Sequence, residues 1–570
     1  MSNDLATGTV DERIAAIETR FGDPLDESNP TGNTALLAAD EAAELSVAGE
    51  ALLDDLALNA EFVPGALGGT FHQLDDLVRV MRHVFRRDVC LGLGYGATSF
   101  MASVNAWCAG NEEQKRQLAG MLLDGQKVSV AYHELAHGND FVRNEFGARP
   151  DGDHYRLHGT KQVINNAARA NAWALFSRTS DAPGSRSHSV FLVERAAIDA
   201  QRLRILPRYR TVGVRGCYLS GLEFDDCPVP ATTLVGDIGQ GVELALRSFQ
   251  LTRSAVPGMA IGATDSSLRT VVRFAVGRQL YRKSVMEIPH AKATLANAFV
   301  DLLIADSLSL AGTRAVHLLP EETSVYAAAV KYLVPRILSD TMQELSIVLG
   351  ARFYVREGEF GFFQKNVRDL PALTLGHAGS AACQATIIPQ LARLARRAWF
   401  AGDEAPAQLF DPHARLPELP FDRLTLASGR DSLSASLVAA VDTLPATNPA
   451  ERAIQSMALR LMDELRQLQE QSLALSAQER TALASPASFA LADRYAVLLS
   501  AAAVLGVWRH ASDPFLADPA WAAAALHRIA GRLGHAPADL PEACETRMHD
   551  EVLRRFHENR SYDLYDTPIA

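Results

Sequence analysis

The sequence predicts an α+β protein that is mainly α, with a β domain between two helical regions and a further helical domain at the end. Leucine and alanine recur three and four positions apart from about residue 36 to 125, and again from about residue 240. Short strand-like runs fill the interval between them, and a proline-rich acidic stretch at 403–422 precedes the last helical region. We therefore expect four domains: an N-terminal α domain (1–125), a barrel-like or sandwich β domain (126–238), a four-helix bundle (239–400) and an additional α domain (401–570).

The helical regions carry the apolar spacing of amphipathic helices. Before the β domain the clearest examples are "DEAAELSVAGEALLDDLAL" and "NEEQKRQLAGMLLDG". After it, "AKATLANAFVDLLIADSLSLAGTRAVHLL" is long enough to belong to a bundle. Residues 1 to about 35 predict an arm or a short helix, and the chain beyond residue 422 predicts three or four further helices.

The β domain is predicted from a change at Gln126, where the helical spacing of apolar residues gives way to strand-like alternation. Five runs alternate like strands and are bounded by turn residues: "KVSVAYHE", "HYRLHGTKQVIN", "AWALFSRTS", "HSVFLVER" and "LSGLEFDDCPVP". Because this alternation ends near residue 235, we expect the strands to form one domain.

Composition excludes several classes of partner. The 570 residues are 48% hydrophobic and 21% charged, with a net charge of -12, so no nucleic-acid partner is expected. Six cysteines without a C-x-x-C spacing predict buried free thiols in a reducing compartment. The polar, acidic start and the absence of an uninterrupted apolar stretch of about 18 residues predict a cytoplasmic protein without a membrane partner.

One motif suggests a metal site and must be weighed first. His133, Glu134 and His137 have the His-Glu-x-x-His spacing of many zinc proteases, which requires a continuous helix to bring both histidines to one face. Here "KVSVAY" alternates like a strand before the motif, and "GND" would stop a helix directly after it. We therefore interpret the stretch as a strand and a polar loop, and expect no metal.

The same stretch resembles a family of flavoenzymes. "VSVAYHELAHGND", followed by "DGDHYRLHGTKQVINNAARAN", is similar to the acyl-CoA dehydrogenase family, whose β domain carries T-E-P-G-x-G-S-D and then D-G-x-x-x-x-x-G-x-K-x-x-I-x-N. The matching positions are Glu134, Gly138, Asn139, Asp140, Gly159, Lys161, Ile164 and Asn166. Further similar segments follow in family order over roughly residues 60 to 395: "GNEEQKRQLAGMLLDGQ", "GVRGCYLSGLEFDDCPVP", "GQGVELALRSFQLTR", "GRQLYRK" and "QKNVRD".

The resemblance implies FAD, with its isoalloxazine between the β domain and the helical bundle, where strand-end loops and a donor near N5 support hydride acceptance. The residues it implies for the cofactor are Tyr132, His133, Glu134, Val163, Ile164, Asn165, Arg278, Tyr281 and Gly350. Asn165 replaces a hydroxyl residue and can still donate to N5, whereas Val163 replaces an aromatic residue. Arg278 matches an arginine that reaches a neighbouring subunit's FAD, which implies a homodimer or homotetramer.

The residues expected at the substrate depart from the family pattern. The usual catalytic glutamate would stand about nine residues after Arg368-Asp369, where this chain has His377, or at the alternative position occupied by Thr252. A neutral imidazole accepts a proton near neutral pH, so His377 is our candidate base. The candidate substrate-binding residues are Asn139, Thr252, Arg253 and Gly376. "VLGARFY" also keeps Gly350 but lacks the glycine-rich sequence that follows it in relatives.

The sequence thus predicts an FAD-dependent oxidoreductase of acyl thioesters, acting on acyl-CoA or on an acyl-carrier protein, in biosynthesis. The electron acceptor is expected to be an electron-transfer flavoprotein or oxygen. Two alternatives remain: an oxidase or monooxygenase on the same fold, and a non-catalytic scaffold. Residues beyond 400 resemble, in position, the extra helical domain of acyl-CoA oxidases.

Overall fold

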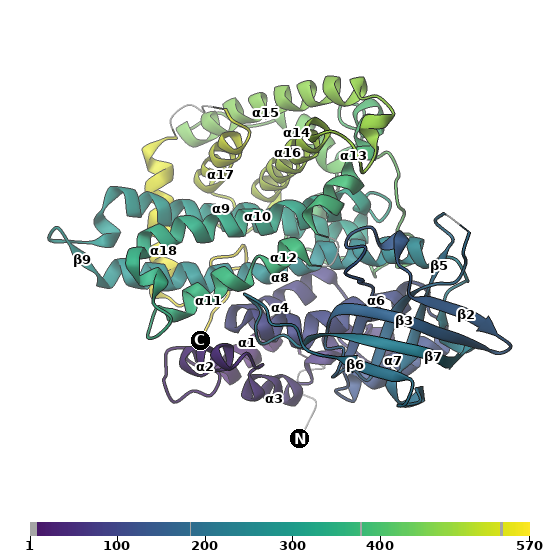
Figure 1. Ribbon diagram of the computed structural model, residues 1–570. Coiled ribbons are helices and arrows are strands. Elements are labelled where there is room, and N and C mark those ends of the chain that lie inside the picture. Colours follow the sequence, from purple (N-terminus) through teal and green to yellow (C-terminus); the bar gives the residue numbers. More distant parts are fainter. Residues whose placement is uncertain (1–7, 183, 377–378, 536–539) are drawn as a thin grey trace. The chain divides into compact units, whose positions relative to one another are not determined.

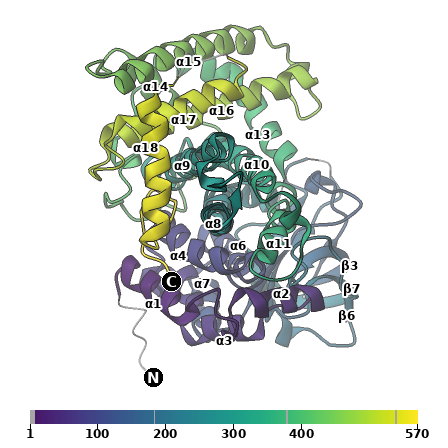
Figure 2. The ribbon, with the colours of Figure 1, turned by 90° about the vertical axis from the view of Figure 1, so that its left-hand side faces the viewer.

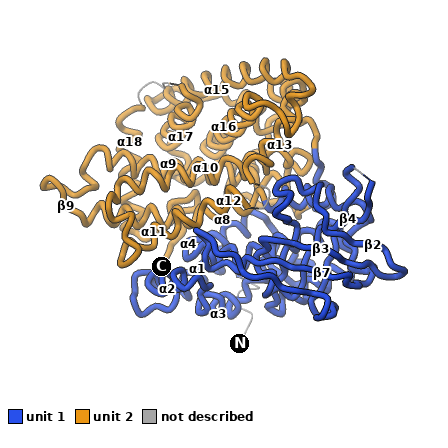
Figure 3. The backbone as a smooth tube through the Cα atoms, viewed as in Figure 1, with its two compact units in different colours: residues 1–252, 420–426 blue, residues 253–419, 427–570 orange. Residues whose placement is uncertain are grey.

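The computed structural model describes residues 8–182, 184–376, 379–535 and 540–570. The chain folds into two compact units (Figure 3): unit 1 comprises the residues up to Thr252 together with Pro420–Leu426, and unit 2 comprises Arg253–Leu419 and Ala427–Ala570. The protein is mainly helical with a central β-sheet domain, as the sequence predicts. The finer division into four domains stays a prediction.

Helices form the first part of unit 1. The α-helices are α1 Val10–Phe21, α2 Asn33–Ala42, α3 Val47–Asp55, α4 Leu74–Arg87, α5 Val89–Leu91, α6 Thr98–Ala109 and α7 Glu112–Leu123. The helical period of residues 36–125 is therefore confirmed. The early segment contains a short helix, α1, whose N-terminus is stabilised by a capping box between Thr9 and Glu12. A π-helix, Gly92–Ala97, joins α5 to α6 and was not predicted.

The β domain of unit 1 is an eight-stranded sheet in the order β6-β7-β3-β2-β4-β5-β8, with β1 pairing parallel to β4. The strands are β1 Val128–Ala131, β2 Gly147–Asp151, β3 His154–Asn165, β4 Ala172–Arg178, β5 His188–Glu194, β6 Leu203–Leu206, β7 Leu219–Pro230 and β8 Leu234–Val235. These bounds confirm the β region predicted from Gln126 to about residue 235. β3 and β7 form a long antiparallel pair next to the edge strand β6 (Figure 1).

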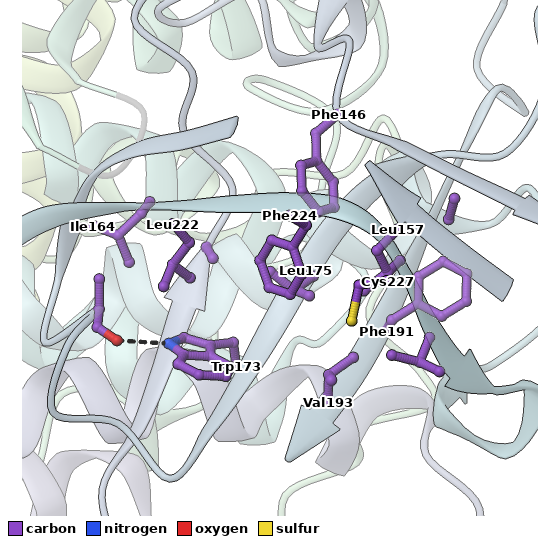
Figure 4. Close-up of a cluster of buried hydrophobic side chains, with 14 of the residues drawn as sticks. Phe146, Leu157, Ile164, Trp173, Leu175, Phe191, Val193, Leu222, Phe224 and Cys227 are labelled. Atoms are coloured by element: carbon purple, nitrogen blue, oxygen red, sulfur yellow. Dashed lines mark hydrogen bonds between the residues drawn. The ribbon is translucent and has the colours of Figure 1, made fainter. Parts of the chain in front are cut away.

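The sheet encloses a hydrophobic cluster that makes it a rigid platform. Figure 4 shows side chains from β3, β4, β5 and β7 converging, with Trp173 and Phe224 near the centre. The Trp173 indole N–H donates to the Ala167 carbonyl at 3.1 Å, so the one polar atom of this large side chain is satisfied within the apolar surroundings. Loops at the strand ends are thereby held by a packed core.

β3 is irregular in its C-terminal half, which contains Gly159, Lys161 and Ile164 of the motif. Its register against β7 shifts between Leu157 and Gly159 and again between Lys161 and Ile164. Val163 and Asn166 have φ values of 56° and 57°. A positive φ is rare for a β-branched residue and costs energy, so the surroundings must hold this bulge in place.

Unit 2 contains the predicted bundle. Its helices are α8 Gly241–Gly277, which begins in unit 1, α9 Pro289–Leu318, α10 Thr323–Leu349, α11 Gly361–Asp369, α12 Ala372–Leu375 and α13 Ser380–Arg397. α9 and α10 pack side by side along their length (Figures 1 and 2), and α13 packs on α10. Between α8 and α9 lies a hairpin of β9 Gln279–Leu280 and β10 Lys283–Ser284.

Among the described residues after 422 there are five α-helices, where the sequence predicted three or four: α14 Ser432–Val441, α15 Pro449–Ala474, α16 Pro486–His510, α17 Pro519–Arg532 and α18 Glu542–His557. α14 is short and apolar on most sides, so its helical period is weakly marked in the sequence. The predicted linker at 403–422 is irregular apart from the short turn Ala407–Leu409.

Two helices, α9 and α16, are long and apolar enough to cross a membrane by length and composition alone. Inside the protein, however, 94% and 83% of their most apolar windows are buried. Core helices of this kind are apolar all round because they are covered on every side. Their composition is thus explained by their position in unit 2.

The C-terminal tail is bound by buried side chains of the bundle. The backbone N–H of Tyr562 donates to Asp265 at 2.5 Å, and that of Leu564 donates to Asp306 at 2.9 Å. Arg269 donates to the carbonyl of Arg555 at 3.1 Å. These charge-assisted bonds fix the tail to α8 and α9.

Candidate functional site

The stretch with the His-Glu-x-x-His spacing is a strand end followed by a loop. β1 ends at Ala131, and residues 135–139 form turns without helix. The ring Nδ1 of His133 lies 3.1 Å from the Gln162 carbonyl, whereas the His137 ring lies 3.8 Å from the Glu145 carboxylate. The strand-and-loop interpretation is confirmed, and the two histidines do not share a helical face. In the ranges that the structure describes, no group of three His, Cys, Asp or Glu residues is arranged to hold a metal ion.

Glu134 is the acceptor at the centre of this loop. Its carboxylate receives a bond of 2.7 Å from the Lys161 ammonium and further bonds from the backbone N–H groups of Glu145 and Phe146, at 2.8 and 3.1 Å. Burial raises the pKa of Glu134, but the Lys161 charge and these bonds outweigh it, so the pKa lies below its ordinary value. The carboxylate is ionised and engaged within the protein, which leaves the loop's backbone as its contribution to a cofactor.

Lys161 is fully buried on β3, beneath the loop. Besides Glu134, its ammonium donates to the Tyr132 carbonyl at 3.3 Å and lies 5.0 Å from the centroid of the Phe146 ring. Burial lowers the pKa of Lys161 to about 8, against the opposing effect of Glu134. The ion pair therefore ties β3 to the loop after β1.

Tyr132 anchors the start of the loop to the helical part of unit 1. Its hydroxyl donates to Asn105 on α6 at 2.6 Å, and burial raises the pKa of this hydroxyl far above its ordinary value. Its ring packs against Phe176 and Phe249, with centroids 5.2 and 6.1 Å away, and Phe141 closes the cluster. Tyr132 is thus a rigid aromatic support.

The structure brings the two predicted cofactor loops together. The backbone N–H of Gln162 donates to the His133 carbonyl at 3.0 Å, and the N–H of Leu135 donates to the Gln162 side-chain oxygen at 3.3 Å. Segments separated by about thirty residues therefore lie side by side at one end of the sheet. Sequence reasoning could place both on strand ends but could not show that they pair.

In the second loop, the three predicted residues have different surroundings. Val163 occupies the strained bulge, and Ile164 is buried in the hydrophobic cluster of the sheet. Asn165 donates its side-chain amide to the Leu93 carbonyl at 3.1 Å and to the Thr98 hydroxyl at 2.7 Å. Both hydrogens of the amide are thereby used, so donation from this group to a flavin N5 would require breaking one of these bonds.

The predicted substrate residues of unit 1 lie at different depths. Asn139 is exposed in the loop, next to Gly138, whose φ of 54° suits a glycine. Thr252 is buried on α8, with its hydroxyl 3.4 Å from the Phe249 carbonyl. Thr252 thus belongs to the packed helix, and Asn139 remains accessible to a ligand.

In unit 2, Arg278 and Tyr281 lie on the hairpin between α8 and α9. The two residues at its tip, Tyr281 and Arg282, have φ values of 52° and 65°, the backbone of a type I′ turn, in which glycine or asparagine is usual. The Tyr281 side chain is 91% exposed. A strained turn that presents an aromatic side chain to solvent is a candidate contact surface.

Of the remaining predicted residues of unit 2, the two glycines lie at helix ends and Arg253 lies within α8. Gly350 ends α10 with a φ of 58°, so glycine is required there by the backbone. Gly376 ends α12, and Arg253 is buried and donates to Thr386 at 3.3 Å. His377 lies outside the described residues, so its role stays a prediction.

Sequence reasoning missed the buried Lys331 on α10. Its ammonium donates to the Leu373 carbonyl at 2.6 Å, and only 3% of the residue is exposed. Burial lowers the pKa of Lys331 to about 8, Cys383 acts against this shift, and the nearby Arg253 charge adds to it. A lone lysine within the apolar run "VYAAAVKYLVP" was the signal that could have found it.

The fold and the paired loops agree with known protein families. The models of the acyl-CoA dehydrogenase middle domain and C-terminal domain match residues 129–227 and 239–391. The chain is thus a helix–sheet–helix protein of the acyl-CoA dehydrogenase kind. Over these two domains the chain matches the acyl-CoA dehydrogenase superfamily.

Individual relatives are distant. The chain is 25% identical over 246 residues to the probable acyl-CoA dehydrogenase FadE25 of Mycobacterium tuberculosis, a match that covers 43% of this chain and 62% of that protein. A solved acyl-CoA dehydrogenase from Bacillus anthracis, complexed with FAD, shares the fold over 99% of this chain and 98% of its own, with a TM-score of 0.67 and 16% identity. The prolyl acyl carrier protein oxidase AnaB covers 66% of this chain and 96% of its own, with a TM-score of 0.60 and 17% identity.

Proposed function

We propose that the protein is an FAD-dependent oxidoreductase that acts on an acyl thioester. The observation that carries the proposal is the pairing of the loops after β1 and within β3, supported by the buried Glu134–Lys161 ion pair. A packed sheet that presents two joined strand-end loops supplies backbone donors and acceptors in a fixed arrangement. The match to the acyl-CoA dehydrogenase superfamily supports flavin as the group they hold.

The residues present fit a flavin on one direct observation. The side-chain oxygen of Asn165 is buried and has no hydrogen-bond partner among the described residues, so the second loop holds an unused acceptor for an N–H group of the cofactor. The residues that would hold the cofactor are Tyr132, His133, Glu134, Val163, Ile164, Asn165, Arg278, Tyr281 and Gly350. When bound, FAD supplies a two-electron acceptor. If Arg278 and Tyr281 serve a second copy's cofactor, as the exposed hairpin favours, the protein is a homodimer or homotetramer.

The chain's own residues would bind the thioester and move one proton. His377 takes the place of the family's glutamate and is proposed to accept the α-proton of the acyl group. Asn139, Thr252, Arg253 and Gly376 are proposed to line the substrate, and a backbone N–H near residue 377 to polarise the thioester carbonyl. The carrier is CoA or an acyl-carrier protein. The oxidase AnaB, whose name specifies a carrier-bound substrate, supports the second choice and a biosynthetic role.

The proposal also includes the cellular compartment and the electron acceptor. All six cysteines are free, which favours a reducing compartment, and we place the protein in the cytoplasm. One solved structure with a similar fold is described as an electron transferring flavoprotein of Acidaminococcus fermentans. This name supports a protein as the electron acceptor. No nucleic acid or membrane takes part in the proposed reaction.

The test is an absorption spectrum followed by anaerobic mixing with acyl thioesters. We expect a yellow protein whose flavin band bleaches with an acyl-CoA or an acyl-carrier substrate. The His377→Gln variant should retain the flavin and lose at least tenfold in bleaching rate, because the amide cannot take up the α-proton. A protein that stays colourless after reconstitution with FAD would overturn the proposal and favour a non-catalytic scaffold.

Reaction with oxygen is a second candidate, favoured by one observation. Val163 stands where relatives place an aromatic residue, and it lies on a bulge whose side chain is partly exposed. A smaller side chain there leaves more of a bound flavin accessible. Hydrogen peroxide or an oxygenated product released in aerated turnover would identify an oxidase or a monooxygenase, and their absence would leave the dehydrogenase.

A further inference from the structure

The π-helix Gly92–Ala97 is buried against the second loop of the β domain. Its glycines allow close packing: a Cβ at Gly92 would lie 2.4 Å from Phe85, and one at Gly96 would lie 2.8 Å from Met81. A π-turn is wider than an α-turn and alters the usual pairing of its carbonyl groups. Two of these carbonyls, of Leu93 and Gly94, accept bonds from the side chains of Asn165 and Asn166.

The hydrogen bonds around Asn165 determine which way its amide faces. The Thr98 hydroxyl has one hydrogen, which it donates to the Leu93 carbonyl at 2.7 Å, so towards Asn165 its oxygen can only accept. The Leu93 carbonyl is also an acceptor. Both neighbours therefore require the NH₂ side of the Asn165 amide, and both of its hydrogens are used.

The other side of the amide is consequently acceptor-only. The Asn165 oxygen is buried and has no hydrogen-bond partner in the part of the chain that the structure describes. A threonine or serine at this position could donate or accept by rotating its hydroxyl, but Asn165 cannot turn without losing two bonds. Thr98 thus controls the polarity of a side chain 67 positions away.

We propose that Thr98 is a positioning residue that presents only the Asn165 carbonyl oxygen to the bound flavin, and thereby favours the reduced cofactor. The inference rests on the proposed function. Oxidised flavin has a lone pair at N5, which an acceptor repels. Hydride from the substrate brings two electrons and one proton to N5, which becomes an N–H donor that an acceptor stabilises.

The test compares FAD affinity in both redox states, or the two-electron reduction potential by equilibration with a dye. In Thr98→Val, one amide hydrogen is released and can serve oxidised N5. We expect the ratio of reduced to oxidised FAD affinity to fall about tenfold, equivalent to a potential about 30 mV lower. Thr98→Ser keeps the hydroxyl and should restore the wild-type ratio.

A double variant separates positioning from general disturbance. With Asn165→Leu as background, adding Thr98→Val should leave the potential unchanged, because the amide through which Thr98 acts is gone. Bound FAD with an unchanged potential in Thr98→Val, or an equal shift in the Asn165→Leu background, would overturn the inference while the proposed function stands. A wild-type protein that takes up no FAD would overturn both. Thermal melting of the flavin-free variants shows whether each one is folded.

Discussion

Lys161 of unit 1 and Lys331 of unit 2 are both buried, and their charges are compensated in different ways. Lys161, in the β domain, lies 2.7 Å from the carboxylate of Glu134. Lys331, on α10, donates to a main-chain carbonyl at 2.6 Å, and the charge that most affects its pKa unfavourably is another cation, Arg253. Burial lowers the pKa of both lysines to about 8. The same desolvation is therefore offset by an ion pair at Lys161, and by a backbone carbonyl and the nearby Cys383 at Lys331.

The difference shows what each lysine does for its surroundings. In the β domain, the pair joins β3 to the loop after β1, and neither charge can be removed alone without leaving the other buried. On α10, Lys331 donates to Leu373 of α12, four residues before His377, and no carboxylate depends on it among the groups that set its pKa. Breaking each lysine's contact should thus have effects of different size and different pH dependence.

The largest effect is expected from Lys161→Met. It leaves the Glu134 carboxylate buried without its cation, and we expect the free energy of unfolding of unit 1 to fall by about 3–5 kcal/mol. Denaturant unfolding of the flavin-free protein measures this loss. The Lys161→Met/Glu134→Gln double variant removes both charges and should recover part of it. A single variant that is as stable as the double variant would show that the ion pair does not hold the loop.

A smaller loss is expected from Lys331→Met. This variant leaves the Leu373 carbonyl without its donor but leaves no buried charge without a partner. We therefore expect the free energy of unfolding to fall by about 1–3 kcal/mol. The loss is partly offset because the variant no longer has to bury an amine. The exposed Lys283→Met is the matched control and should change stability by less than about 0.5 kcal/mol. If Lys331→Met destabilised the protein as much as Lys161→Met, the contrast between the two lysines would be lost.

The pH dependence of stability is a separate test of the buried charge of Lys331. The pKa of Lys331 is about 8 in the folded protein and about 10.5 in the unfolded chain, so between these values only the unfolded chain holds the proton. Stability then rises with pH, and wild type should gain about 1 kcal/mol over Lys331→Met between about pH 7 and 8.5. Urea titrations of both proteins at several pH values measure the gain. A difference that stays constant or shrinks over this interval would contradict the prediction.

The smallest change in stability is expected from breaking an exposed ion pair, which serves as a reference for the buried one. Arg204 on β6 contacts Glu223 on β7, and both side chains are more than one third exposed. Solvent screens such a pair, so Glu223→Gln should change the free energy of unfolding by less than about 1 kcal/mol. A larger change would mean that charge pairs of the β domain matter wherever they lie, and would weaken the case for burial as the cause.

Much of the fold could be predicted from sequence periods and turn residues, because strands and amphipathic helices alternate over long distances. The number of helices after residue 422 could not, because a short apolar segment such as Ser432–Val441 lacks a marked polar face. The π-helix was also missed, since its glycines gain meaning only from the side chains packed against them.

Within the site, the motif residues could be found, but their partners could not. Glu134 and Lys161 were recognised as motif positions, yet their ion pair depends on the bulge in β3. Asn165 was expected to donate to a flavin, and the structure uses both of its hydrogens on Leu93 and Thr98, far away in the sequence. Such contacts are set by tertiary packing, which a single sequence does not reveal.

The chain returns briefly to unit 1 at Pro420–Leu426, and this has a practical consequence for dissecting the protein. Arg247 donates to the Phe421 carbonyl at 2.7 Å, and Gln250 to the Thr425 carbonyl at 2.8 Å. A shortened gene that stops near codon 400, where a standard dehydrogenase would end, deletes both acceptors and exposes the Phe71 ring that Phe421 contacts. An expressible fragment of the first unit would therefore need these seven residues grafted back through a linker.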